Sequence, residues 1–304
     1  MLDLSIVVLS WNTRELTLAC LAALQRDESR LTREIIVIDN ASHDGSADAI
    51  AAAHPGVQLV RNAANRGYAG GNNQGAALAQ GEYLCLLNSD TEVRPLALDR
   101  LVGFLRAAPA HGAVAPRLVH PDGSVQHACM RFPGLATALC FDTVFGRVWP
   151  GTAVVARYHM RDFDHLTSRD VAQPPGACFV IARAEYLAMG GFDEELWLYF
   201  NDVDLCRRLA QAGRRIHYLA TAEVMHHVGG STRSLQKIAV AWHRNRLAYY
   251  RKHYGPWCMP YLRAITRWRA LEEWIRAGRR HAEKANVRAE RAFLKQCLQE
   301  ILAP

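Results

Sequence analysis

The chain has 304 residues, of which 50% are hydrophobic and 21% are charged, so it is not a disordered tail and can bury a large core. Its formal net charge of +7 is uneven, because residues 241–304 carry 14 Lys+Arg against 5 Glu (+9) and residues 1–240 carry 22 basic and 24 acidic residues (−2). Its 8 cysteines form no CxxC pair, which argues against a zinc site and a secreted disulfide framework, and no apolar run approaches the roughly 20 residues of a membrane span.

The N-terminal half alternates between apolar runs and segments with helical spacing. Continuous apolar runs are typical of parallel strands that are buried on both faces, and strand–helix alternation predicts an α/β fold with such a sheet. The segment 69–80 is expected to open as a glycine-rich loop and continue as a helix. The strands are expected at 4–11, 34–40, 57–62 and 82–88, and the helices at 12–25, 46–54 and 69–80.

The second half changes character after a Pro121-Asp122-Gly123 turn, which predicts a hairpin. Residues 131–175 show no clear periodicity. A strand and a helix are expected over 176–192, a helix over 202–213 and a strand over 215–227. From residue 235 the pattern is helical nearly to the end. We therefore expect a domain over 1–234 and a helical extension over 235–304.

Polar side chains follow the expected strands where each strand ends. Ligands bind outside the carboxyl ends of the strands in parallel α/β sheets. An aromatic ring, carboxylates, amides and an arginine at that edge suit a nucleotide and a metal on its phosphates. The segment 65–75 contains neither GxxxxGK[ST] nor GxGxxG, so it could also be a plain turn. The candidate nucleotide contacts are Ser10, Trp11, Asn12, Asp39, Asn65, Arg66, Gly71, Asn73, Asn88 and Ser89.

Three further residues are candidates for the chemistry. Asp202 follows a group of aromatic residues at the start of an expected helix, so it is a candidate general base. Asp204 also lies in that first turn, where a favourable interaction with the helix dipole explains it without catalysis. His226 ends a strand before glycines, where a ligand can approach closely. Asp90, after the fourth expected strand, is either a metal ligand or a helix cap.

The motifs SIVVLSWN, EIIVIDNASHDGS, NRGYAGGNNQG, LLNSD, GACFVIARAEYLAMGGFDE, YFNDVDLCRRL and HHVGGST occur in this order. Together they resemble the family 2 glycosyltransferases of the GT-A fold, and in particular the bacterial rhamnosyltransferase-like branch. The resemblance covers about residues 4–232. It implies a GT-A (Rossmann-like), mainly parallel sheet flanked by helices.

The resemblance also implies roles for individual residues. Trp11 matches the aromatic residue that stacks on the base, and Asp39 matches the base-binding carboxylate. The DxD metal motif matches Asn88-Ser89-Asp90, so Asp90 is the main carboxylate for the metal. The catalytic Asp of the family's Glu-Asp pair matches Asp202, with Asn201 in place of Glu. His226 matches the metal- or diphosphate-binding histidine, with Ser231 completing H-x-x-G-x-S.

The function implied is an inverting, metal-assisted glycosyltransferase that uses Mg²⁺ or Mn²⁺. The best donor is dTDP-L-rhamnose, and the acceptor is a lipid-linked glycan or a polysaccharide. A sugar-1-phosphate nucleotidyltransferase is disfavoured, because the first strand runs into Ser10-Trp11-Asn12-Thr13 instead of a basic, glycine-rich loop. A non-catalytic nucleotide-sugar-binding subunit that scaffolds a membrane-associated assembly is the other alternative. Asn201 favours it, and the presence of Asp90, Asp202 and His226 argues against it.

The C-terminal segment combines Trp242, Trp257, Trp268 and Trp274 with arginines. This composition is typical of a surface that lies on an anionic membrane, but it equally fits helices that pack on the domain or on a second subunit of a homo-oligomer. Nucleic acid is not expected as a partner. Because the early Asp3 and the short run IVVL do not predict a signal peptide, we expect a cytoplasmic protein, and a peripheral position on the inner face of the plasma membrane is the first of these two alternatives.

Overall fold

The computed structural model describes residues 2–141, 143–149, 152–227, 235–280 and 284–303. The chain divides into two compact units. Unit 1 comprises residues 1–130, 163–197 and 201–231, and unit 2 comprises residues 131–162, 198–200 and 232–304. The expected boundary at residue 234 between the domain and the helical extension stays a prediction. The division into compact units describes packing and does not show which residues carry the activity.

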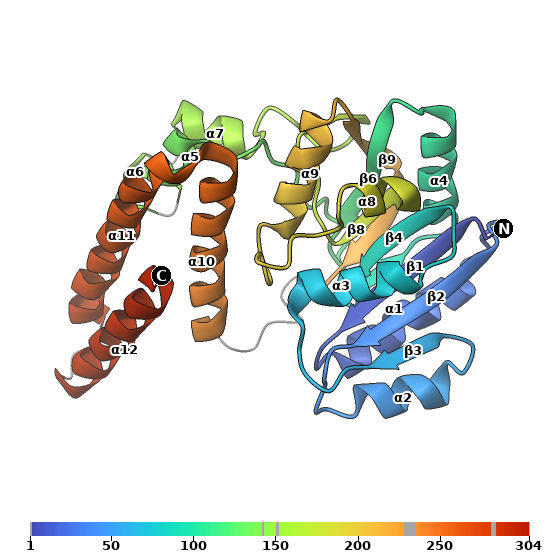
Figure 1. Ribbon diagram of the computed structural model, residues 1–304, viewed down its shortest axis with the longest axis horizontal. Coiled ribbons are helices and arrows are strands. Elements are labelled where there is room, and N and C mark those ends of the chain that lie inside the picture. The colour runs from blue at the N-terminus through green and yellow to red at the C-terminus, as the bar shows by residue number, and fades with distance from the viewer. Residues whose placement is uncertain (1, 142, 150–151, 228–234, 281–283, 304) are drawn as a thin grey trace. The chain divides into compact units, whose positions relative to one another are not determined.

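Unit 1 is built on one mixed sheet of nine strands, with β7 paired to β9 outside the order β3-β2-β1-β4-β8-β6-β9-β5 (Figure 1). The strands β1 to β4 are parallel to their neighbours within that group, as expected for their apolar runs. The strand β8 is antiparallel to β4 and β6, and β6 is parallel to β9. The bounds are β1 Leu4–Ser10, β2 Arg33–Asp39, β3 Gln58–Arg61, β4 Tyr83–Asn88, β5 Thr91–Val93, β6 His111–Val119, β7 Arg169–Asp170, β8 Cys178–Ala182 and β9 Arg215–His226.

Helices cover both faces of this sheet (Figure 1). Side chains alternate along β1, so Ile6 and Val8 join the core cluster that contains buried residues of α1 and α4, while Val7 and Leu9 face α3. The expectation of a sheet with two covered faces is therefore confirmed. The helices of unit 1 are α1 Arg14–Arg26, α2 Ser46–Ala53, α3 Gly67–Leu78, α4 Ala97–Ala107, α8 Arg183–Ala188 and α9 Asn201–Gln211.

The glycine-rich segment differs from its expected form. It is helical from Gly67 onward, and its glycines lie inside α3 and not in a preceding loop. A Cβ atom on Gly71 would lie 2.4 Å from Leu9 Cδ1, and one on Gly75 would lie 2.3 Å from Val7 Cγ1. The glycines therefore let α3 approach β1 more closely than any other residue would allow.

The strand register brings the polar strand ends together. Ser10 pairs with Asp39 across β1 and β2, and Leu9 pairs with Asn88 across β1 and β4. The short strand β5 follows directly after Asp90 and runs antiparallel to β9, with Thr91 opposite His226. This pairing places Asp90 beside His226, although 136 positions separate the two in the chain.

Unit 2 is helical, as expected for residues 235–304. The long helices α10, α11 and α12 contact one another, and the short 3-10 helix η1 contains Pro256 (Figure 1). Residues 131–162, which lack a sequence pattern, form short helices held by hydroxyl groups, since Tyr250 and Tyr254 donate to the carbonyls of Gly134 and Pro133. The bounds are α5 Leu135–Cys140, α6 Val144–Val148, α7 Ala153–Tyr158, α10 Leu235–Tyr254, η1 Pro256–Cys258, α11 Met259–Arg280 and α12 Lys284–Leu302.

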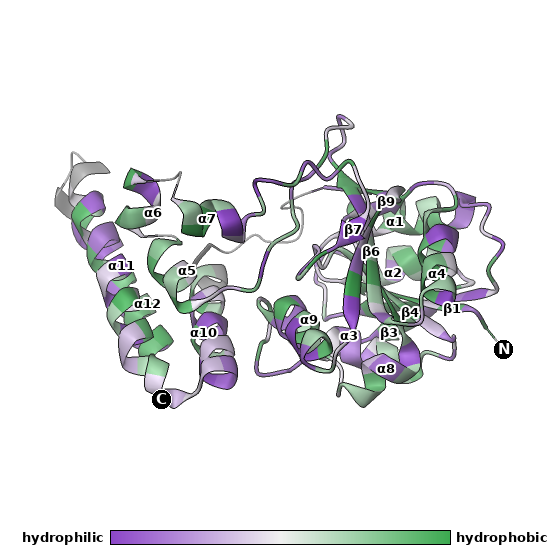
Figure 2. Ribbon diagram, turned by 90° about the horizontal axis from the view of Figure 1, so that it is seen from above, coloured by the Kyte–Doolittle hydropathy of each residue, from purple (hydrophilic) through white to green (hydrophobic). Residues whose placement is uncertain are grey.

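The hydropathy colours agree with these packing roles. In Figure 2 the long helices of unit 2 carry hydrophilic and hydrophobic residues side by side along their length. Within the described ranges, every helix is too short or too polar to cross a lipid bilayer.

Candidate active site

Asp90 and His226 form the best-defined pair of candidate metal ligands. Asp90 is 3% exposed, and its Oδ1 lies 3.5 Å from His226 Nε2. This separation is close to that of two neighbouring ligands around one cation, about 3 Å for ligand bonds of 2.1 Å at right angles. The backbone carbonyl of Asp90 also accepts a hydrogen bond from His227 N. A buried carboxylate and an imidazole at this spacing fit a divalent cation such as Mg²⁺ or Mn²⁺.

Gln126 orients His226 and was not predicted from the sequence. Its Nε2 donates to the carbonyls of His226 and Val119 at 2.8 and 3.3 Å, which leaves Oε1 as the acceptor. Oε1 lies 3.0 Å from His226 Nδ1, so this nitrogen carries the proton. The other ring nitrogen, Nε2, then faces Asp90. An outer-shell partner of this kind fixes the tautomer and orientation of a metal-binding histidine.

Asp202 begins the second half of the site at the N-terminus of α9. Its Oδ1 accepts a hydrogen bond from Val203 N at 2.8 Å. Burial raises the pKa of Asp202, and the hydrogen bonds from Val203 and the Gln173 side chain only partly oppose this effect. A carboxylate with a raised pKa in a cleft is suited to accept a proton. Gln173 lies in the segment before β8 that has no clear periodicity, so no sequence pattern indicated its role.

Tyr68 and Gly176 lie between the two halves. Tyr68 donates a hydrogen bond to the carbonyl of Gly176 at 3.1 Å. A Cβ atom on Gly176 would lie 3.1 Å from Asp202 Oδ2, so the backbone passes directly beside the candidate base. Burial raises the pKa of Tyr68, and the charges of Asp202 and Asp90 raise it further. Tyr68 is therefore a neutral donor to the Gly176 carbonyl.

Asp39 and Trp11 are the residues predicted to bind the base. Asp39 is 3% exposed, and its Oδ2 accepts from Ser42 N. Its Oδ1 is buried and makes no hydrogen bond to any described residue. A buried carboxylate oxygen without a donor is costly, which indicates that a ligand N–H completes this site. Trp11 follows β1 and is 36% exposed, so its ring has a free face.

Several other residues that were predicted to contact the nucleotide make hydrogen bonds within the protein. Asn12 has φ 54° and accepts from His43 N, while Asn65 accepts from Asn40 Nδ2 and Gly67 N. Arg66 is exposed and its backbone N–H donates to Asn40. Asn73 accepts from Phe192 N and donates to its carbonyl. These bonds shape the loops around the strand ends, and contact of these residues with a nucleotide stays a prediction.

The remaining predicted residues hold the strand ends together. Ser10 is buried and its hydroxyl lies 2.9 Å from that of Thr17. The Ser89 hydroxyl lies 3.0 Å from that of Thr13, and Asn88 N donates to the carbonyl of Ala177. Gly71 packs on Leu9, as described above. Ser231 lies outside the described residues.

Asp204 has a structural partner. Its fully buried carboxylate accepts from Arg208 Nε at 2.8 Å, and Arg208 also donates to the carbonyl of Gly191. A buried charge that is paired in this way anchors α9 and is not open to a substrate.

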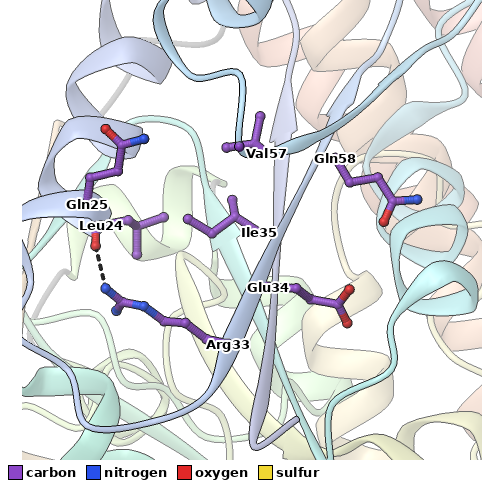
Figure 3. Close-up of a pocket in the computed structure, with 8 residues that line it drawn as sticks. Leu24, Gln25, Arg33, Glu34, Ile35, Val57 and Gln58 are labelled. Atoms are coloured by element: carbon purple, nitrogen blue, oxygen red, sulfur yellow. Dashed lines mark hydrogen bonds between the residues drawn. The ribbon is translucent and has the colours of Figure 1, made fainter.

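A pocket elsewhere in unit 1 lies at the opposite edge of the sheet. It is lined by the starts of β2 and β3 and by Leu24 and Gln25 of α1 (Figure 3). The Arg33 guanidinium donates hydrogen bonds to the Leu24 carbonyl at 2.7 Å and to the Asp27 carboxylate. The pocket is thus separate from the strand-end carboxylates, and we assign it no role.

Comparison with known proteins agrees with this geometry. The chain can be superimposed on the mannosyltransferase PcManGT from Pyrobaculum calidifontis, solved with GDP-Man and Mn²⁺, with a TM-score of 0.56 and 18% identity over 99% of this chain and 88% of that one. The fold is therefore the GT-A fold of glycosyltransferases. The family model for Glycosyl transferase family 2 matches residues 5–161, more than half of the chain. The chain belongs to glycosyl transferase family 2.

Two curated relatives extend the comparison. The chain is 29% identical to the N-acetylglucosaminyl-diphospho-decaprenol L-rhamnosyltransferase of Mycobacterium tuberculosis (strain ATCC 25618 / H37Rv) over 258 residues, 80% of each chain. It is 34% identical to the O-antigen biosynthesis protein RfbC of Myxococcus xanthus over 194 residues, 62% of this chain and 14% of that protein. The expected rhamnosyltransferase-like branch is thereby confirmed.

Proposed function

We propose that the protein is an inverting glycosyltransferase that moves L-rhamnose from dTDP-L-rhamnose to a hydroxyl group of a lipid-linked or polysaccharide acceptor. The observation that carries the proposal is the pair Asp90 and His226, whose Oδ1 and Nε2 lie 3.5 Å apart, together with the raised pKa of Asp202 at the start of α9. The choice of donor and acceptor rests on the relatives, of which one is named for an L-rhamnosyl transfer to a decaprenol-linked sugar.

The donor is bound along the strand ends. The free Oδ1 of Asp39 accepts a base N–H, and the exposed ring of Trp11 stacks on the base. Asp90 and His226 would hold the divalent cation. When bound, the cation supplies positive charge where the leaving diphosphate becomes more negative.

Asp202 acts on the acceptor. Its carboxylate takes the proton of the acceptor hydroxyl, whose oxygen forms a bond to the anomeric carbon as the bond from that carbon to the diphosphate oxygen breaks. One such displacement inverts the anomeric configuration. Positioned general-base catalysis contributes typically about 10²–10⁴ in rate.

Asn201 supports catalysis more than it opposes it. Its Nδ2 donates to the carbonyl of Leu196, and its Oδ1 accepts from the backbone N–H of Asp202 at 2.8 Å. The first bond requires a donor that a glutamate would lack. The amide thus shapes the turn that presents Asp202, and this argues against a non-catalytic scaffold that has lost its function.

The test combines ligand screening with transfer assays on the purified protein. A thermal-shift screen of dTDP-, UDP- and GDP-sugars with Mg²⁺ or Mn²⁺ should select the dTDP donor, since a ligand at 100 times its Kd stabilises by about 2.7 kcal/mol. Asp202→Asn should bind this donor normally and lose about 10²–10⁴ in kcat. Asp48→Asn, which changes an exposed carboxylate of a surface ion pair, is the matched control and should keep full activity. Normal turnover by Asp202→Asn, or no shift with any nucleotide, would overturn the proposal.

A further inference from the structure

A second group of metal-binding side chains lies at the far end of the sheet from the candidate active site. His111 begins β6, His217 is near the start of β9, and Asp170 lies in the two-residue strand β7. His226 is nine residues further along β9, which corresponds to about 30 Å of extended strand. The two groups are therefore separate.

The three side chains converge on one point. His111 Nε2 and His217 Nδ1 lie 2.9 and 2.7 Å from the same oxygen, Oδ1 of Asp170. The ligand atoms of all three residues lie within 4.8 Å of one another. The two histidine side chains are only 8% and 14% exposed, whereas that of Asp170 is 40% exposed. The strand pairing of β7 with β9, in which Asp170 lies opposite His217, fixes this arrangement.

Phe104 forms an apolar wall behind the imidazoles. Its ring stacks on His217 at a centroid distance of 4.2 Å and meets His111 edge-on at 5.0 Å. The two imidazoles are nearly perpendicular, at 81°. Packing of this kind limits rotation of both rings, so their nitrogens point at Asp170 without the cost of ordering them on binding.

The nitrogen–oxygen spacing requires little adjustment to admit a cation. Two ligands at about 2.0–2.1 Å from a tetrahedral metal ion are about 3.3 Å apart. The observed nitrogen–oxygen distances are shorter by about half an ångström, and the partly exposed Asp170 is able to move by that amount. Two imidazoles and one carboxylate with a fourth position open to water are a ligand set of catalytic and regulatory zinc sites.

We propose that His111, Asp170 and His217 bind a divalent transition-metal ion, with Zn²⁺ as the best match. The absence of CxxC pairs argues only against a cysteine-based site, and this one uses nitrogen and oxygen ligands. Two features limit its affinity. His111 Nδ1 is buried without a partner among the described residues, so the ring lacks an outer-shell acceptor. Arg215 Nη1 lies 3.3 Å from the other oxygen of Asp170 and repels a cation.

The bound ion would fasten β7 to the start of β9. The strand β7 has only two residues, and its segment continues to Gln173, whose side chain binds Asp202. Three positions separate Asp170 from Gln173. Metal binding would therefore stabilise the segment that supports the candidate base, although the site itself requires no assumption about the reaction.

The test uses the full-length protein after removal of metal by a chelator. Titration with Co²⁺, followed by visible absorption and by competition with Zn²⁺, should reveal an ion that is bound by nitrogen and oxygen ligands and is still bound in the Asp90→Asn variant. Asp170→Asn and His217→Gln should each lower the affinity at least about tenfold, because loss of even an outer-shell partner has this effect. His43→Gln, which removes an exposed imidazole elsewhere, and Asp90→Asn, which disables the other candidate site, should keep the Co²⁺ spectrum.

Arg215→Gln supplies a gain-of-affinity variant. It removes the positive charge beside Asp170 and leaves all three ligands in place, so it should bind Zn²⁺ more tightly than the unchanged protein. This variant also guards against misfolding of the histidine variant, since the Arg215 side chain is 58% exposed. An unchanged protein that binds no Co²⁺, or Co²⁺ binding that survives Asp170→Asn and His217→Gln and is lost with Asp90→Asn, would overturn the proposal.

Discussion

The burial that suits Asp202 to accept a proton also lowers the stability of the folded protein at neutral pH. Burial raises its pKa, which means that the folded protein holds the charged carboxylate at a cost. The contribution of protonated Asp202 to the stability of the folded protein is fully present at pH values below its ordinary pKa of 3.8. This contribution is lost as the pH rises through the pKa of Asp202 in the folded protein. Asp202→Asn keeps an oxygen that can accept from Val203 N but cannot become charged.

We therefore expect Asp202→Asn to be more stable than the unchanged protein at pH 7, and the difference to vanish below about pH 4. Urea unfolding at a series of pH values measures this, with Asp48→Asn as an exposed control that should show no such trend. A variant that is less stable at pH 7 would mean that the carboxylate is favourably bound in the fold.

Gln126 gives a second residue-scale prediction. Gln126→Leu removes the acceptor that fixes the Nδ1 proton of His226, so affinity for Mn²⁺ at the candidate site should fall about 10–100-fold. Gln126→Glu keeps an acceptor oxygen and should recover part of this loss. Calorimetric titration of Mn²⁺ in the presence of dTDP measures the effect. Equal affinity in Gln126→Leu would show that His226 does not depend on this bond.

The sequence indicated the candidate reactive residues but not the residues that hold them in place by hydrogen bonds. Asp90, Asp202 and His226 could be proposed because each stands at a boundary between an apolar pattern and a polar one. Gln126 and Gln173 stand in segments without such a pattern. Their roles depend on hydrogen bonds to β9 and to the start of α9, far along the chain, and no local spacing encodes these contacts.

At the scale of elements, α3 shows how the sheet positions its strand ends. Gly71 and Gly75 of α3 face β1, so the helix lies close to the strand that ends at Ser10. Gly75→Ala should destabilise the protein by about 1–3 kcal/mol, because a Cβ atom there meets the fully buried Val7.

The matched control is Gly103→Ala in α4. A Cβ atom there meets nothing within 4 Å, so removal of glycine from a helix should stabilise by about 0.5–1 kcal/mol. Urea unfolding of both variants compares them directly. A neutral Gly75→Ala would mean that α3 can move away from β1 without loss.

The buried central strands could be predicted from the hydrophobic pattern of the sequence, whereas the shortest strands and helices could not. The strands β1, β2 and β4 are continuous apolar runs that are buried, and this signal is local. The strand β5 has three residues, and the helices α5 to α7 have five or six, which is too short for a period to emerge. Their positions depend on partners far along the chain, such as β9 for β5 and the tyrosines of α10 for residues 133–134.

For the whole molecule, charge separates the two units in a way that the fold alone does not explain. The excess of +9 belongs to residues 241–304, which form three helices of unit 2, while the candidate site belongs to unit 1. Sugar transfer alone does not account for this basic segment. We therefore infer that the segment binds a partner outside the chain. An acceptor on a lipid would bring the enzyme to a membrane whose inner surface is anionic.

One face of α11 and the preceding turn fits such a surface. Trp257, Tyr261, Trp268, Leu271 and Ile275 are exposed at intervals of 4, 7, 3 and 4 residues, the spacing of one helical face. Arg263 and Arg267 are exposed on the same helix. Aromatic and apolar side chains can enter the headgroup region while arginines bind lipid phosphates.

We expect the protein to co-sediment with vesicles that contain phosphatidylglycerol and to be released by high salt. Replacement of Trp268 and Leu271 by serine should lower binding about tenfold or more, because each side chain contributes about 1.5 kcal/mol or more when it leaves water. Phe293→Ser removes an exposed aromatic ring from α12 and is the control. If the double variant binds vesicles as well as the control does, and the unchanged protein instead sediments as a dimer that the double variant cannot form, the exposed face of α11 is a subunit interface.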